Sequence, residues 1–164
     1  MCKGRKVLVI GSGADLVGRG LGKKIDSGHW DVVVRVNQPF GDPRDVGTKM
    51  DVLVTRWRCW VPQFFKGPVR YEHLVVLNER IGMSSNEINM ASVEVGAERV
   101  SAGLCACIWA LNRGAKSVSV IGFGYHPSTG WAHQKRYPDG TLDQNTHYNW
   151  LAENRWLENN VTLI

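Results

Sequence analysis

Short apolar runs rich in β-branched residues recur along this chain, and they constrain its fold more than any other feature. They cover residues 6–10, 31–37, 50–55, 73–78 and 118–123, and most of their residues are apolar. Runs of this length and composition are typical of strands that are buried on both faces. Strands buried in this way occur mainly in parallel sheets, so the runs favour a parallel sheet covered by helices.

The segments between these runs contain patterns typical of helices. Residues 101–112 form the clearest one, with Ser101 as a predicted N-cap and Gly114 as a predicted stop. Shorter helices are expected at 21–25, at 85–95 and, after a Thr146 cap, at 147–158. Residues 41–44 and 124–146 are predicted loops, and 161–164 a terminal edge strand. This alternation predicts one Rossmann-like α/β domain spanning residues 1–164, with a mostly parallel twisted sheet and helices on both faces.

Composition narrows the class of protein further. The chain has 164 residues with a net charge of +5, which suits a single soluble domain and an anionic ligand. No apolar run is long enough for a signal peptide core or a membrane span. The four cysteines have no metal-binding spacing, and no Asp-x-Asp cluster is present to hold a divalent ion. We therefore expect reduced thiols, a cytoplasmic location and no metal site.

Two glycine-rich turns follow strands that can be neighbours in such a sheet. Gly11-Ser12-Gly13 follows the first run, and Gly122-Phe123-Gly124 follows the last long one. Glycine lets backbone N–H groups approach a phosphate closely, and ligands of α/β sheets bind at the carboxyl ends of strands. The second run ends at Asn37 without the acidic residue that an NAD site requires, so NAD is disfavoured. A ligand-free strand-to-helix turn is the alternative explanation for the first glycine turn.

A longer pattern around the first turn resembles the large sialyl motif of the family 29 sialyltransferases. The matching positions, in order, are Gly11, Leu16, Gly18, Gly20-Leu21-Gly22, Ile25-Asp26-Ser27, Arg35-x-Asn37 and Asp45-Val46-Gly47-Thr48. Ser12 and Asp15 stand where the family has asparagines.

The remaining motifs of that family have counterparts in the same order. The small sialyl motif is similar to Ser101-Ala102-Gly103 followed by residues 118–124. Trp131-Ala132-His133 resembles the aromatic–histidine motif. His147 with Glu153 resembles the very small motif, with one residue more between them than is usual.

The resemblance implies a glycosyltransferase with a GT-A-variant-like fold. It would transfer sialic acid or a related sugar from a CMP-activated donor to a hydroxyl acceptor such as a glycan. The reaction would invert the anomeric centre and use no metal or other cofactor. By position in the motifs, His147 would be the general base and His133 would bind the donor phosphate. The other implied nucleotide- or substrate-binding residues are Gly11, Ser12, Gly13, Asp15, Asn37, Ser101, Ala102, Gly103, Gly122, Phe123 and Trp131.

Other readings of these residues remain open. Asn37 could only end a strand, and Ser101 could only cap a helix. The same fold could serve as a nucleotide-binding module without catalysis. Residues 56–60 interleave arginine with tryptophan, which would suit nucleic acid, although packing of the two tryptophans over the sheet is favoured.

Overall fold

A computed structural model describes residues 1–37, 41–55, 73–76, 91–96, 100–127, 130–131 and 149–164. Its centre is a sheet with six strands among these residues, in the order β4-β3-β2-β1-β5-β8, and every neighbouring pair is parallel. The strands are β1 (Lys6–Ile10), β2 (Val32–Val36), β3 (Val52–Thr55), β4 (His73–Val76), β5 (Ser117–Ile121) and β8 (Thr162–Leu163).

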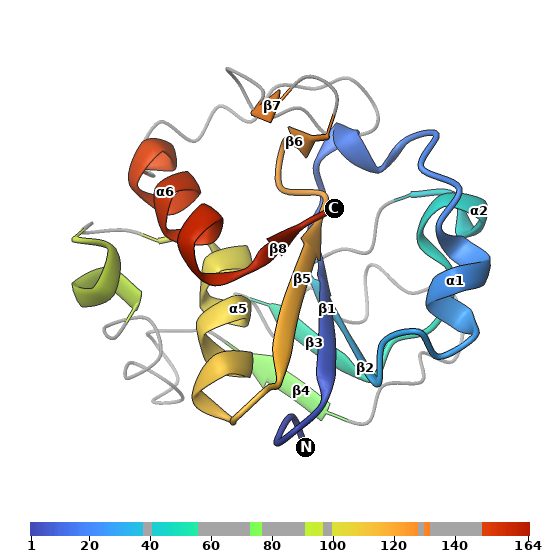
Figure 1. Cartoon of the computed structure of the whole chain (residues 1–164), viewed down its shortest axis with the longest axis horizontal. Helices are drawn as coiled ribbons and strands as arrows, with labels where there is room; N and C mark the ends of the chain where they lie inside the picture. Colours follow the sequence, from blue (N-terminus) through green and yellow to red (C-terminus); the bar gives the residue numbers. More distant parts are fainter. Residues whose placement is uncertain (38–40, 56–72, 77–90, 97–99, 128–129, 132–148) are drawn as a thin grey trace.

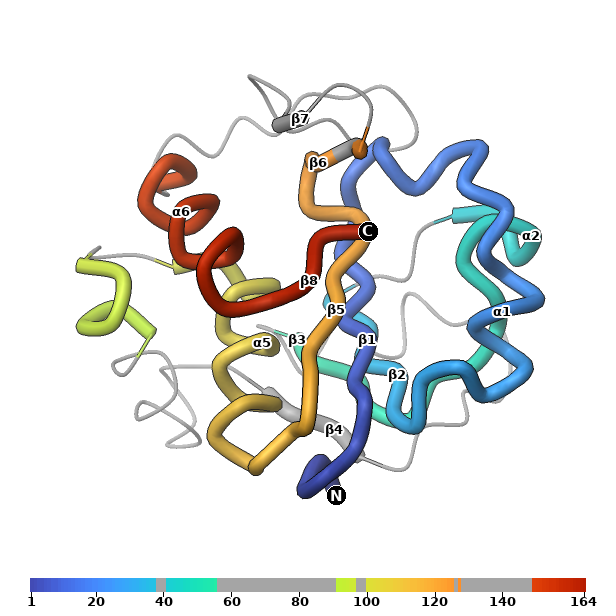
Figure 2. The backbone as a smooth tube through the Cα atoms, in the orientation of Figure 1, coloured from blue at the N-terminus to red at the C-terminus, as the bar shows by residue number. Residues whose placement is uncertain are grey.

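Helices cover both faces of this sheet (Figures 1 and 2). The 3-10 turn η1 (Ala14–Leu16), α1 (Gly22–Asp26) and α2 (Pro43–Val46) lie on one face. The longer helices α5 (Ala102–Asn112) and α6 (Trp150–Asn160) lie on the other, and residues 91–95 are also helical. A hairpin of β6 (Tyr125–His126) and β7 (Gly130–Trp131) follows β5.

Strand β1 shows why the sequence favours two covered faces. Val7 and Val9 belong to the buried cluster formed with α5, whereas Leu8 and Ile10 belong to the cluster formed with α1. Successive side chains of a strand point to opposite faces, so a run without polar residues can be buried on both. Full burial of each such side chain contributes about 1.5–3 kcal/mol. The predicted Rossmann-like α/β fold is confirmed.

Three expectations about the elements are wrong. Residues 124–146 were expected to be loop, but residues 125–126 and 130–131 pair as the antiparallel hairpin β6–β7. Residues 41–44 were expected to be loop, but Pro43 begins α2 and the Asp42 side chain caps it by accepting from the Arg44 N–H at 2.8 Å. Proline is favoured at the first helical position because its missing N–H is not needed there. Helix α6 begins at Trp150 with Asn149 as its N-cap, three residues later than expected.

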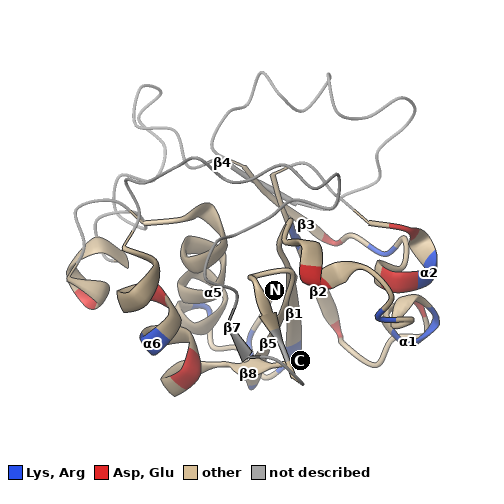
Figure 3. Cartoon of the chain, turned by 90° about the horizontal axis from the view of Figure 1, so that it is seen from above, with Lys and Arg blue, Asp and Glu red and all other residues tan. Residues whose placement is uncertain are grey.

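Charged groups of both signs lie on α1, α2 and α6 (Figure 3). These helices therefore present no surface of a single charge. Within the described ranges, no helix is long and apolar enough to cross a bilayer. Cys105 and Cys107 were expected on different faces of a helix. Neither forms a disulfide, and both are fully buried because α5 is covered on nearly all sides.

Candidate functional site

The candidate site lies at the carboxyl ends of β1 and β5. From β1 the chain adds β2, β3 and β4 on one side, and it then returns to add β5 and β8 on the other. Ligands of open parallel sheets bind where the strand order reverses in this way. The turns at Gly11–Gly13 and Gly122–Gly124 leave the sheet at this point, and β6 and β7 lie beyond it (Figure 1).

The two glycine turns are bonded to each other through their backbones. The Gly11 N–H donates to the Ile121 carbonyl, and the Gly13 N–H donates to the Gly122 carbonyl, both at 2.8 Å. A β-carbon added at Gly11 would lie 2.3 Å from the Gly122 oxygen, which no side chain could tolerate. Gly122 also has a φ of +81°, which favours glycine. The mutual approach of the turns therefore explains both glycines without a ligand.

The Asp15 carboxylate joins the same two turns. It accepts from the Gly122 N–H through Oδ2 and from the Gly124 N–H through Oδ1, each at 2.8 Å. Burial raises the pKa of Asp15, and the two glycine N–H groups oppose this rise. The Asp15 carboxylate therefore has backbone partners within the protein, and its predicted contact with a nucleotide stays a prediction.

Ser12 has a side chain that the described residues leave unsatisfied. It is 7% exposed, and its hydroxyl has no hydrogen-bond partner in the described part of the chain. Buried polar groups of proteins are nearly always paired, so a buried hydroxyl without a partner calls for an explanation such as a ligand. Ser12 lies between Gly11 and Gly13, at the strand end where a ligand is expected.

The Phe123 ring connects the strand turns to the N-terminus of α5. A β-carbon added at Gly103 would lie 2.7 Å from Cε1 of this ring, and one added at Gly11 would lie 3.1 Å from Cδ2. The ring therefore fits against two glycines that are far apart in sequence. Gly11, Gly103, Gly122 and Phe123, all predicted site residues, are thus brought together.

Ser101 is the N-cap of α5, and its polar groups are engaged within the protein. Its hydroxyl accepts from the Leu104 N–H at 3.1 Å and donates to Oε2 of Glu153 at 2.6 Å. The Ser101 N–H donates to Oε1 of Glu153 at 2.7 Å. Glu153 is 2% exposed. The predicted N-cap is confirmed, and a nucleotide contact by the Ser101 hydroxyl remains a prediction. Ala102 follows in the first turn of α5.

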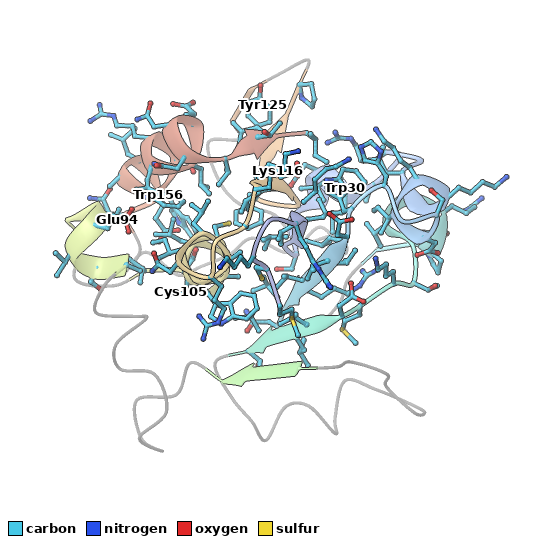
Figure 4. All side chains as sticks on the ribbon, turned by 60° about the horizontal axis from the view of Figure 1, so that its bottom comes forward. Trp30, Glu94, Cys105, Lys116, Tyr125 and Trp156 are labelled. Carbon is cyan, nitrogen blue, oxygen red and sulfur yellow. The ribbon has the colours of Figure 1, made fainter. Side chains whose placement is uncertain are left out.

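Helix α6 holds Glu153 in place and makes a second polar contact. The indole Nε1 of Trp156 donates to Oε1 of Glu94 at 2.9 Å, and the two side chains point toward each other (Figure 4). Trp156 and Leu157 also join the buried cluster on the α5 side of the sheet. These two contacts fix α6 against Ser101 at the start of α5 and against Glu94.

Asn37 directly follows β2 at the same edge of the sheet. It has a φ of +54°, in the left-handed region that asparagine adopts more readily than most residues. Its N–H donates to the Val54 carbonyl at 2.7 Å. The neighbouring Arg35 is 4% exposed, and burial lowers its pKa to about 10. The Arg35 guanidinium donates to the carbonyls of Val46, Gly47 and Lys49.

Two further carboxylates of the large motif have structural roles that sequence reasoning missed. Asp45 accepts from the N–H groups of Gly18 and Gly20 at 2.9 and 2.8 Å. Asp26 accepts from the N–H groups of Thr48 and Lys49, each at 2.8 Å. No spacing in the sequence signals these pairs, because the acceptors are side chains and the donors are backbone groups more than twenty residues away.

Several predicted residues are not placed by these contacts. His133 and His147 lie outside the described residues, as do residues 56–60. Trp131 is described only through its backbone, which pairs with Tyr125 in the β6–β7 hairpin. The assignment of a general base and of a phosphate-binding histidine therefore stays a prediction.

Comparison with solved structures identifies proteins of the same fold. A mammalian sialyltransferase in complex with Gal-beta-1-3GalNAc-ortho-nitrophenol matches with a TM-score of 0.65 and 17% sequence identity, covering 98% of this chain and 69% of that one. A second structure of a mammalian sialyltransferase matches with a TM-score of 0.68 at the same identity and coverage. No protein-family model and no curated protein matches the sequence. The likeness establishes that the chain has a sialyltransferase-like fold.

Proposed function

We propose that this protein is a glycosyltransferase that transfers sialic acid or a related sugar from a CMP-activated donor to a hydroxyl acceptor. The observation that carries the proposal is the meeting of two glycine turns at the reversal of strand order between β1 and β5. The buried Ser12 hydroxyl, without a partner among the described residues, supports a ligand at this point. The sialyltransferase-like fold supports the class of reaction.

In the proposed reaction, the acceptor hydroxyl attacks the anomeric carbon of the donor sugar from the side opposite the phosphate. The bond from that carbon to the phosphate oxygen breaks, CMP departs and the anomeric centre inverts. His147 takes the hydroxyl proton, a role that suits histidine because it titrates near neutral pH. His133 and the N-terminus of α5 stabilise the charge on the departing phosphate. No metal takes part. By analogy with the ligand of one structural neighbour, the acceptor is a glycan.

The first experiment is calorimetric titration of CMP into the wild-type protein and into His147→Ala, with AMP and NAD as control ligands. Of the three ligands, we expect only CMP to bind. Its affinity for His147→Ala should be within about threefold of its affinity for wild type, because a base that deprotonates the acceptor need not contact the nucleotide. Hydrolysis or transfer of the donor sugar should then fall at least about 100-fold in His147→Ala. Absence of CMP binding at millimolar concentration would contradict the proposed function.

A CMP-binding module without catalysis is the second candidate. The observation that favours it is that Asp15 and Glu153 already occupy N–H groups of the β5 turn and of Ser101. These groups would otherwise be available to a phosphate. CMP binding without any donor turnover by the wild-type protein would select this candidate over the transferase.

A further inference from the structure

We propose that Asp15 is a positioning residue. It holds the glycine turns after β1 and β5 and the N-terminus of α5, which would line the proposed nucleotide site (the nucleotide crevice), at a fixed separation. The inference rests on the proposed function, because it assumes that a nucleotide binds between the glycine turns. Asp15 belongs to η1, directly after the first turn, and its two oxygens bond the N–H groups on either side of Phe123. The carboxylate thus fixes the backbone of the second turn at two points.

The contacts of Phe123 extend this restraint to a third segment. Its ring lies against Gly11 on the β1 side and against Gly103 in the first turn of α5. If the backbone at Gly122 and Gly124 moved, the ring would leave one or both glycines. Asp15 therefore sets the distance between the β1 turn, the β5 turn and the N-terminus of α5, the three backbone segments predicted to contact the nucleotide.

The surroundings of Asp15 fit a fixed restraint rather than a mobile side chain. A β-carbon at Gly13 would lie 2.3 Å from Oδ1 of Asp15, so the carboxylate is packed directly against the first turn. Behind it, Nη1 of Arg19 reaches the Asp15 carbonyl at 3.5 Å, and this guanidinium lies near enough to favour the ionised carboxyl. The carboxylate is therefore held from the β1 side while it holds the β5 side.

A matched control exists in the same chain. Asp45 also bonds two glycine N–H groups, those of Gly18 and Gly20, but it lies on the α1–α2 side and touches neither crevice turn. Asp45→Ala removes the same number and kind of hydrogen bonds as Asp15→Ala. A general loss of stability would affect both variants, whereas loss of crevice geometry is specific to Asp15.

The test is CMP binding by calorimetry for wild type, Asp15→Ala, Asp15→Asn and Asp45→Ala, with thermal unfolding of each protein. We expect Asp15→Ala to weaken CMP binding at least tenfold, and Asp15→Asn to weaken it less because its amide oxygen retains one acceptor. Asp45→Ala should remain within threefold of wild type. If Asp15→Ala does not fold, the loss of CMP affinity in Asp15→Asn is compared with the loss in Asp45→Asn. A larger loss in Asp15→Asn is then the expected result.

The outcomes separate this inference from the proposed function. If wild type binds CMP and the Asp15 variants bind within twofold of it, or lose no more affinity than the Asp45 variants, the positioning role is wrong and the nucleotide site stands. If wild type does not bind CMP, the proposed function fails first. Amide hydrogen exchange at Gly122 and Gly124 then shows separately whether the carboxylate restrains the turn, and unchanged exchange in Asp15→Asn would overturn that restraint.

Discussion

Several carboxylates in the described part of the chain bind backbone N–H groups rather than cations. Asp15, Asp26 and Asp45 each accept from two successive or alternate N–H groups in turns that contain glycine or lie beside one. Hydrogen bonds to an ionised acceptor are stronger than neutral ones, so a single side chain can fix an irregular turn. In a chain with 18 glycines, such carboxylates supply order that the turns themselves lack.

Asp15 and Asp26 should give opposite pH dependences of stability. Burial alone would raise the pKa of Asp26, but hydrogen bonds from Lys49 and Thr48 lower it on balance, so its contribution is present at neutral pH and is lost as pH falls. The pKa of Asp15 is raised, chiefly by burial, so its contribution is present at low pH and is lost as pH rises through that pKa. Urea unfolding of wild type, Asp15→Asn and Asp26→Asn from about pH 2 to about pH 8 measures both, because the Asp26 contribution is lost only below its ordinary pKa of 3.8. Parallel profiles for the three proteins would contradict these assignments.

At the scale of residues, the sequence predicts where the polar groups lie better than what they contact. Ser101 could be predicted as an N-cap because a cap is a local signal. The partners of Asp15 and Glu153 could not, because they are backbone groups that only the fold brings near. The glycines of the two turns suggested a ligand. The structure shows that the close packing of the turns against each other also requires glycine at these positions.

Helices α5 and α6 are joined by a buried polar contact rather than by apolar packing alone. Glu153 projects from the first turns of α6 and bonds the N–H and hydroxyl of Ser101 at the start of α5. The contact therefore fixes the first turn of α6 against the start of α5.

Removing the Glu153 carboxylate should release α6. Glu153→Ala is expected to lower the free energy of unfolding by about 3 kcal/mol, because two hydrogen bonds are lost in a buried place and the Ser101 N–H is left without its acceptor. Glu153→Gln keeps one acceptor and should cost about half as much. Exposed Glu158 on the same helix is the control, and Glu158→Ala should change stability by about 0.5 kcal/mol or less. Equal losses at the two positions, measured by urea unfolding, would be inconsistent with the contact.

The strands could be predicted from sequence because burial on both faces leaves a continuous apolar run, as at residues 7–10 of β1 and 32–34 of β2. Helix boundaries were harder to predict. Asp42-Pro43 reads equally as a turn and as a cap with proline at the first helical position, and the structure has the cap. Both Thr146 and Asn149 are suitable caps by residue type, and the structure has Asn149 as the N-cap of α6.

For the whole molecule, the order of strands determines where a ligand can bind. The single reversal between β1 and β5 leaves one place at the carboxyl edge where two loops diverge to opposite faces. The described charged residues on α1, α2 and α6 are of both signs, so these helices offer no positively charged surface that would bind an anion in place of the strand reversal (Figure 3). The location of the proposed crevice thus follows from topology.

Hydrogen exchange of the whole chain with and without CMP tests this location. We expect added protection in peptides that contain residues 11–15 and 122–124, which line the reversal from both sides. Peptides from α1 and α2 should change little, since those helices lie on the outer face. AMP serves as the control nucleotide. Protection confined to α1 and α2 would place the nucleotide elsewhere on the molecule.

The bond between Asp15 and Gly122 joins residues 107 positions apart in the chain. Closing so long a loop carries an entropic cost that must be met before the contact contributes, and parallel pairing of distant strands forms late for this reason. On a ribosome, β1 would have to wait for β5, which is synthesised only after most of the chain has emerged. The capacity to hold a nucleotide would therefore appear among the last properties of the folding protein, and its presence would report that folding is complete.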